Sequence, residues 1–152
     1  LISRLNYYTR DLLRGLSHHY MGSAEQAQPY LQDVESELLR ELAENPGQFT
    51  VLQSLCQVQA ALGKRDEAES ICAEARERIL PDAFMRGEHL FNLAAGMALA
   101  GADDQAFDYL EESLATGAAF NMNVIGLHPA FEPLKNDSRY IELSNRYPVA
   151  VP

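Results

Sequence analysis

The chain has few of the residues that mark specialised classes of protein. It has no tryptophan and only two cysteines in 152 residues, so neither a disulfide-rich scaffold nor a C-x-x-C metal or redox motif is present. No apolar run reaches the roughly 18 residues that a membrane-spanning helix needs. Alternating apolar and polar residues, the pattern of half-buried strands, are nearly absent, and only residues 121–125 resemble a strand. The sequence therefore predicts a soluble, all-α domain.

Positive charge is also scarce. Twelve Lys and Arg residues stand against 22 Asp and Glu, which gives a formal net charge of -10. Such a surface repels phosphate backbones and anionic lipid, so we expect neither nucleic-acid binding nor membrane insertion. The chain starts at Leu1 without a charged-then-apolar signal segment, which predicts a fragment of a longer protein. A soluble location, with the cytoplasm favoured, is the expectation.

A short box recurs three times in the chain. It reads G-S-A-E-Q-A at residues 22–27, G-K-R-D-E-A at 63–68 and G-A-D-D-Q-A at 101–106. Apolar residues at helical spacing precede and follow each copy, so each box is expected to be the bend of a helical hairpin. Glycine can end the first helix in the left-handed conformation, and the acidic residue suits the positive end of the second helix.

Two further expectations follow from the boxes. Ser23 and Gln26 fit a capping box at the start of the second helix of the first hairpin. The box alanines should lie where the paired helices cross, so Ala68 and Ala106 are predicted to be buried.

The box alanines are 41 and 38 residues apart, against a period of about 34 residues for tetratricopeptide (TPR) repeats. On these boxes the chain resembles the TPR family, although it lacks the family's tryptophan and its first copy has Pro29 inside a helix. The resemblance implies one domain over residues 1–152. It would be a right-handed α-α superhelix of three hairpins, at about 4–44, 48–80 and 82–116, closed by a cap at 118–147.

The last part of the chain, F-E-P-L-K-N-D-S-R-Y-I-E-L at residues 131–143, carries a second resemblance. It is similar to the tail that closes TPR arrays in bacterial signalling proteins, where such arrays follow a cyclase, kinase, winged-helix or TolB-like domain. We expect a final helix of about ten residues, capped by Asn136 or Asp137 and docked on the second helix of the third hairpin. Its large apolar side chains should be buried: Phe131, Leu134, Tyr140, Ile141 and Leu143.

Catalytic motifs are missing from the sequence. It contains no P-loop, dinucleotide-binding glycine motif, H-E-x-x-H or G-x-S-x-G. The pairs His18–His19 and Glu88–His89 are sequence neighbours, whose side chains diverge by about 100° on a helix. We therefore predict a protein that is not an enzyme and has no catalytic residue, cofactor or metal site.

The TPR resemblance implies a concave groove lined by the first helices of the hairpins. Transferred onto this chain, the groove residues are His19, Tyr20, Gln53, Gln57, Glu88, Phe91, Ala95 and Leu99. This wall lacks the Lys and Arg that hold a terminal carboxylate, so an apolar protein segment anchored on Phe91 is the expected ligand. The alternative is that the chain's own C-terminal segment covers Phe91 and Leu99.

These observations favour a non-catalytic scaffold that binds a protein segment or a neighbouring domain. The alternative is the regulatory or sensory arm of a larger bacterial signalling protein, which controls dimerisation or senses a small ligand. Cys56 and Cys72 are expected on facing helices of the second hairpin as two free thiols, because helix packing already closes that hairpin.

Overall fold

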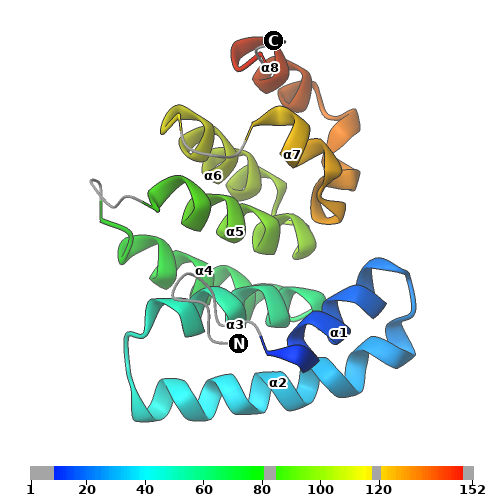
Figure 1. Ribbon diagram of the computed structural model, residues 1–152, viewed down its shortest axis with the longest axis vertical. Helices are drawn as coiled ribbons and strands as arrows, with labels where there is room; N and C mark the ends of the chain where they lie inside the picture. The colour runs from blue at the N-terminus through cyan, green and yellow to red at the C-terminus, as the bar shows by residue number, and fades with distance from the viewer. Residues whose placement is uncertain (1–8, 81–84, 118–120, 149–152) are drawn as a thin grey trace.

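The computed structural model describes residues 9–80, 85–117 and 121–148, and the regular structure within them is helical, as predicted (Figure 1). The helices are α1 Arg10–Tyr20, α2 Ala24–Glu44, α3 Phe49–Ala61, α4 Arg65–Glu77, α5 Arg86–Leu99, α6 Asp103–Ala115, α7 Met122–Leu127, the 3-10 helix η1 Pro129–Asn136, and α8 Ser138–Arg146. The predicted starts of the first and third hairpins and of the cap, at residues 4, 82 and 118, lie outside the described residues.

Consecutive helices pair through the glycine boxes. Helices α1 and α2, α3 and α4, and α5 and α6 pack together, and the glycines at the three bends have φ angles of 73°, 75° and 69°. After each glycine the next residue donates its N–H to the carbonyl five residues earlier, which is the Schellman pattern of a helix end: Ser23 to His18, Lys64 to Gln59 and Ala102 to Met97. The left-handed conformation explains why glycine stands at each bend.

Of the two further predictions made from the boxes, the burial of the alanines is confirmed and the capping box is wrong. Ala68 and Ala106 are completely buried, as predicted. Ser23 is the N-cap of α2, but its side chain makes no capping hydrogen bond. Its ψ of 62° lies outside the extended region in which a serine hydroxyl reaches the next turn, so the predicted capping box does not form.

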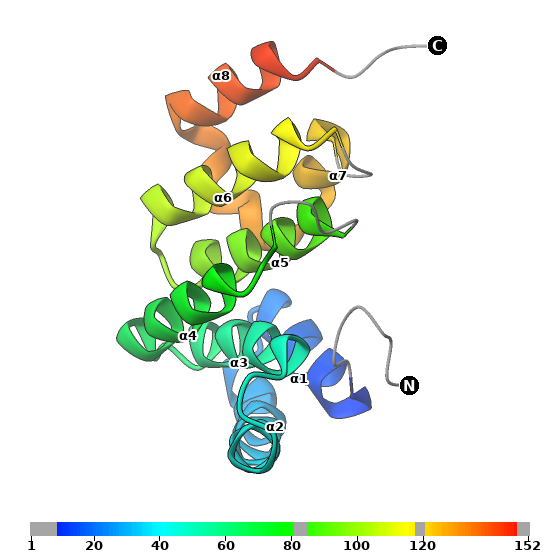
Figure 2. The same cartoon turned by 90° about the vertical axis from the view of Figure 1, so that its left-hand side faces the viewer.

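The central helices α3 and α5 are buried along their middle parts, at residues 51–60 and 90–98, and are partly exposed at their ends. Helix α3 packs against α1, α2, α4 and α5, and α5 packs against α3, α4, α6 and η1. The pairs follow one another along the long axis of the molecule, with α2 at one end and α8 at the other; Figure 2 shows the same order from the side. In the described segments, no helix combines the length and apolar character that a membrane span requires.

The two cysteines correct the expectation of free thiols. Cys56 of α3 and Cys72 of α4 do lie on facing helices of one hairpin, but they form a disulfide, with Cα atoms 5.3 Å apart. This separation falls within the range that a disulfide requires. Both residues are completely buried. The prediction of free thiols considered only whether the hairpin needs a disulfide for its stability. It did not consider the distance between α3 and α4 at these two positions.

The described part of the C-terminal segment, residues 121–148, is built of helices. Residues 122–127 form α7 rather than a strand, because the Asn121 side chain accepts hydrogen bonds from the backbone N–H groups of Asn123 and Val124 and caps the helix. Helix α8 has nine residues, and Asp137 caps it as predicted by accepting from the Arg139 N–H.

The tail is buried less completely than expected. Phe131, Leu134 and Leu143 are buried, Tyr140 is partly buried, and Ile141 is 58% exposed. Only one stripe of α8 faces α6, and Ile141 lies off that stripe. Helix α8 packs against α6, the second helix of the third hairpin, as predicted, whereas η1 packs against α5, the first helix of that hairpin.

Candidate functional site

The predicted groove residues divide into two groups. Gln53, Gln57, Phe91 and Ala95 are buried, whereas His19, Tyr20, Glu88 and Leu99 are partly exposed. The eight residues therefore do not line one open surface.

The two buried glutamines connect α3 to α5. The Gln57 amide donates a hydrogen bond to the Asn92 carbonyl at 3.1 Å, and Gln53 Oε1 lies 3.2 Å from Nδ1 of His89. The His89 ring also meets Phe49 edge to face, with ring centroids 4.5 Å apart, and burial lowers the pKa of this histidine. These polar groups serve the packing of two core helices, and we assign them no ligand-binding role.

Phe91 is covered by the C-terminal segment. Its ring centroid lies 5.4 Å from that of Phe131 and 5.4 Å from that of His128, both in edge-to-face contact. With 4% of its surface exposed, Phe91 does not offer an anchor to a partner in this conformation. The structure therefore agrees with the alternative for Phe91, in which the chain's own C-terminal segment covers this residue. Leu99 remains partly exposed.

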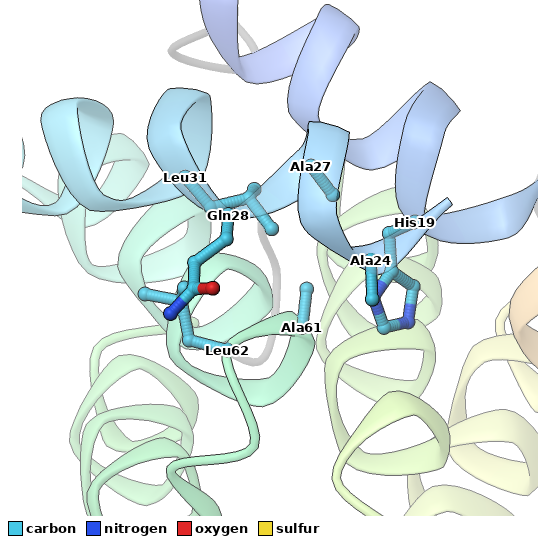
Figure 3. Close-up of a pocket in the computed structure, with 7 residues that line it drawn as sticks. All are labelled: His19, Ala24, Ala27, Gln28, Leu31, Ala61 and Leu62. Atoms are coloured by element: carbon cyan, nitrogen blue, oxygen red, sulfur yellow. The ribbon is translucent and has the colours of Figure 1, made fainter. Parts of the chain in front are cut away.

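An open apolar cleft lies beside the accessible end of the predicted groove (Figure 3). It has a volume of about 240 Å³ and is formed by the end of α1, the start of α2 and the end of α3. Its lining residues are His19, Ala24, Ala27, Gln28, Leu31, Ala61 and Leu62. The Gly22 bend places small residues at the start of α2, which leaves room between the first hairpin and α3.

The cleft has no charged side chain in its lining, and five of its seven lining residues are alanine or leucine. Ala27 and Leu31 are buried, while the Gln28 amide and the His19 imidazole lie on opposite sides of Ala61 in Figure 3. Burial lowers the pKa of His19, so its ring is neutral at pH 7 and can donate or accept one hydrogen bond. The lining contains no carboxylate, thiol or hydroxyl, and no catalytic set can be built from it.

Sequence reasoning placed His19 near a binding surface but did not assign Ala24, Ala27, Gln28, Leu31 or Leu62 to one. For the four residues of α2 the signal was present in the first box and the turn that follows it, since residues 24, 27, 28 and 31 lie on one face of a helix. That face was predicted only to pack against the paired helix. The open space depends on where α3 ends against it, which no local pattern states.

A second cleft, of about 320 Å³, lies between α6 and α8. Phe107 and Leu143 are buried in it, and the Arg139 guanidinium lies over the Phe107 ring at 4.3 Å. Arg139 pairs with Asp137 at 2.8 Å and with Asp104 at 2.7 Å, and Arg146 pairs with Glu111. Its two arginines are thus engaged in holding α8 on α6, which gives the D-x-R element of the tail a packing role.

No group of three or more metal-binding side chains occurs among residues 9–80, 85–117 and 121–148. Comparisons with known proteins returned no significant match to a family model, to a curated protein or to a solved structure. The cleft at His19 is therefore the candidate site on its geometry alone.

Proposed function

We propose that the chain is a non-catalytic protein-interaction module of the TPR type, with its three hairpins stacked as a right-handed α-α superhelix. In this proposal the cleft at His19 receives an apolar side chain from a segment of a partner protein. The observation that carries the proposal is the convergence of small and apolar residues from α1, α2 and α3 on an open, uncharged cleft.

The cleft suits a protein segment better than a polar metabolite. Its volume is below the usual range of about 300–1,000 Å³ for small-molecule pockets, and its polar groups are one imidazole and one amide. A leucine or phenylalanine side chain would fill the apolar part, while Gln28 and His19 could bond the partner's backbone at the rim.

A photo-crosslinking amino acid at Gln28 tests this function. In extracts of the source organism, we expect an adduct with a defined protein that is lost when Ala61→Arg fills the cleft. The matched controls are Ala73→Arg on the exposed face of α4 and a crosslinker at exposed Ser70. Equal labelling from residues 28 and 70, or an adduct that survives Ala61→Arg, would contradict the proposal.

A second candidate function is the regulatory or sensory arm of a larger bacterial signalling protein. It is supported by the tail motif, whose Asp137 and Arg139 fold into a compact cap at the end of the helix stack. Sequencing the gene upstream of Leu1 tests it. A cyclase, kinase or winged-helix domain in frame is the expected result, and a short independent reading frame would rule the candidate out.

A further inference from the structure

Four aromatic rings join the first hairpin to the C-terminal segment. The His128 ring, between α7 and η1, lies 6.0 Å from the ring of Tyr20 at the end of α1. It also lies 5.4 Å from Phe91 of α5 and 5.3 Å from Phe131 of η1. The C-terminal segment thus extends across the end of the predicted groove, from α5 to α1.

His128 has a second role in this segment. Its Nδ1 accepts a hydrogen bond from the Ala130 N–H at 3.3 Å, so the imidazole caps η1. An accepting Nδ1 carries no proton, which places the proton of the neutral ring on Nε2. Adding a proton at Nδ1 removes the acceptor and puts positive charge at the N-terminal end of η1, where the backbone N–H groups disfavour it.

The surroundings of His128 offer the charged form little compensation. The three rings that face it, Tyr20, Phe91 and Phe131, come from α1, α5 and η1, and the phenol of Tyr20 is the only titratable group among them. No ion pair between described residues involves His128. Burial accordingly lowers the pKa of His128 below its ordinary value of 6.5.

We propose that α7 and η1 form an internal latch over the groove, held closed by neutral His128, and that protonation of His128 opens the latch and uncovers Phe91. The lowered pKa of His128 means that a fall in pH favours the open state of the latch. The closed state binds fewer protons than the open state, so its stabilisation is complete above pH 6.5 and is lost as the pH falls from 6.5 toward the lower pKa of the closed state. Binding of a partner to the uncovered Phe91 ring rests on the function proposed above. The opening of the latch itself does not depend on that function.

Hydrogen exchange of the whole chain tests the latch without any partner. Protection of the amides in residues 121–136 is compared at pH 7.5 and 5.5, after correction for the intrinsic pH dependence of exchange, with α3 as the internal reference. One histidine with an open-state pKa near 6.5 can weaken the closed state by up to about tenfold over this interval. We expect a loss of several-fold in residues 121–136 and little change in α3.

Two variants assign the effect to one residue. His128→Asn supplies a side-chain oxygen to cap η1 but does not titrate, so protection of the segment should become independent of pH. His89→Gln removes another partly buried imidazole and should leave the pH dependence of residues 121–136 in place. Unchanged protection of the wild-type segment, an equal loss in α3, or a pH dependence that persists in His128→Asn would each overturn the latch.

Discussion

Gly96 of α5 lies directly against the sulfur of Cys56 in α3. A Cβ atom at position 96 would collide with Cys56 Sγ and lie 3.4 Å from Cys72 Sγ. The backbone of a third helix, α5, therefore packs directly against the disulfide between α3 and α4. The packing of the second hairpin on the third depends on the absence of a side chain at position 96.

We predict that Gly96→Ala lowers the free energy of unfolding by about 1–3 kcal/mol, although alanine is the better helix former. The cost comes from overpacking against the Cys56 sulfur, so it should shrink when Gly96→Ala is made in the Cys56→Ala/Cys72→Ala background. Urea denaturation of the four proteins gives this double-mutant cycle. An equal cost in both backgrounds would show that the sulfur is not the obstacle.

The disulfide itself should stabilise the protein. It closes a loop with a sequence separation of 16 residues, for which the chain-entropy model gives about 3 kcal/mol. Alkylation of the unfolded, unreduced protein with N-ethylmaleimide at neutral pH, followed by mass spectrometry, should find no free thiol, and reduction should lower the melting temperature. Two alkylated cysteines in unreduced protein would contradict the bridge and restore the expectation of free thiols. Because stable disulfides are rare in the cytosol, this result also bears on the favoured cytoplasmic location.

The helices and their bends could be predicted from the sequence because both are local. Glycine in the left-handed conformation, an apolar stripe and a buried alanine each involve residues close in the chain. The boxes at Gly63 and Gly101 contain the glycine and the alanine, and the apolar stripes flank them. The Asp137 cap was predicted for the same reason. Asn121 was missed because a strand-like pattern was given more weight than its capping side chain.

The candidate site depends on contacts between distant residues. His19 and Ala61 line one cleft although 42 positions separate them, and Phe91 is buried by residues 37 and 40 positions further along. The family resemblance supplied groove positions but not what covers them. The packing of η1 on α5, a contact between residues distant in the sequence, decides between Phe91 as an anchor and Phe91 covered by the tail.

Because the box alanines are buried, larger side chains at these positions are expected to lower the stability of the protein. Ala68→Leu and Ala106→Leu should each lower the free energy of unfolding by about 1–3 kcal/mol, because a larger side chain pushes the paired helices apart. Ala73→Leu, on the exposed face of α4, is the matched control and should change stability by less than about 0.5 kcal/mol. Thermal denaturation of the three variants measures the difference. Melting temperatures equal to that of the wild type at both positions 68 and 106 would refute the crossing contact.

The capping of α8 should be sensitive to acid. Hydrogen bonds from Arg139 lower the pKa of Asp137 from 3.8 to about 2. Stabilisation from the ionised carboxylate is thus complete above pH 3.8 and is lost as the pH falls through about 2. Hydrogen exchange of residues 138–146 between pH 5 and 2 should show this loss. Asp137→Asn retains a capping oxygen without titrating, so its α8 should be less protected at pH 5 and nearly independent of pH below it; an unchanged acid response would place the titrating group elsewhere.

The docked tail leads to the last prediction. Phe131, Leu134 and Leu143 are buried against α5, α6 and one another, and each such side chain contributes roughly 1.5–3 kcal/mol before ordering entropy is subtracted. A chain truncated after Gly117 exposes the faces of α5 and α6 that the tail covers, Phe91 among them.

We therefore expect this truncated chain to melt several degrees lower than the full chain, or to aggregate through the exposed face. At this size each kcal/mol shifts the melting temperature by about 2–4 °C. A chain ending at Pro148 is the control and should melt like the full chain, because it retains η1 and α8. Scanning calorimetry with light scattering distinguishes the outcomes. If the chain ending at Gly117 stays monomeric with an unchanged melting temperature, the tail is not a structural cap, and its apolar residues become candidates for binding a partner.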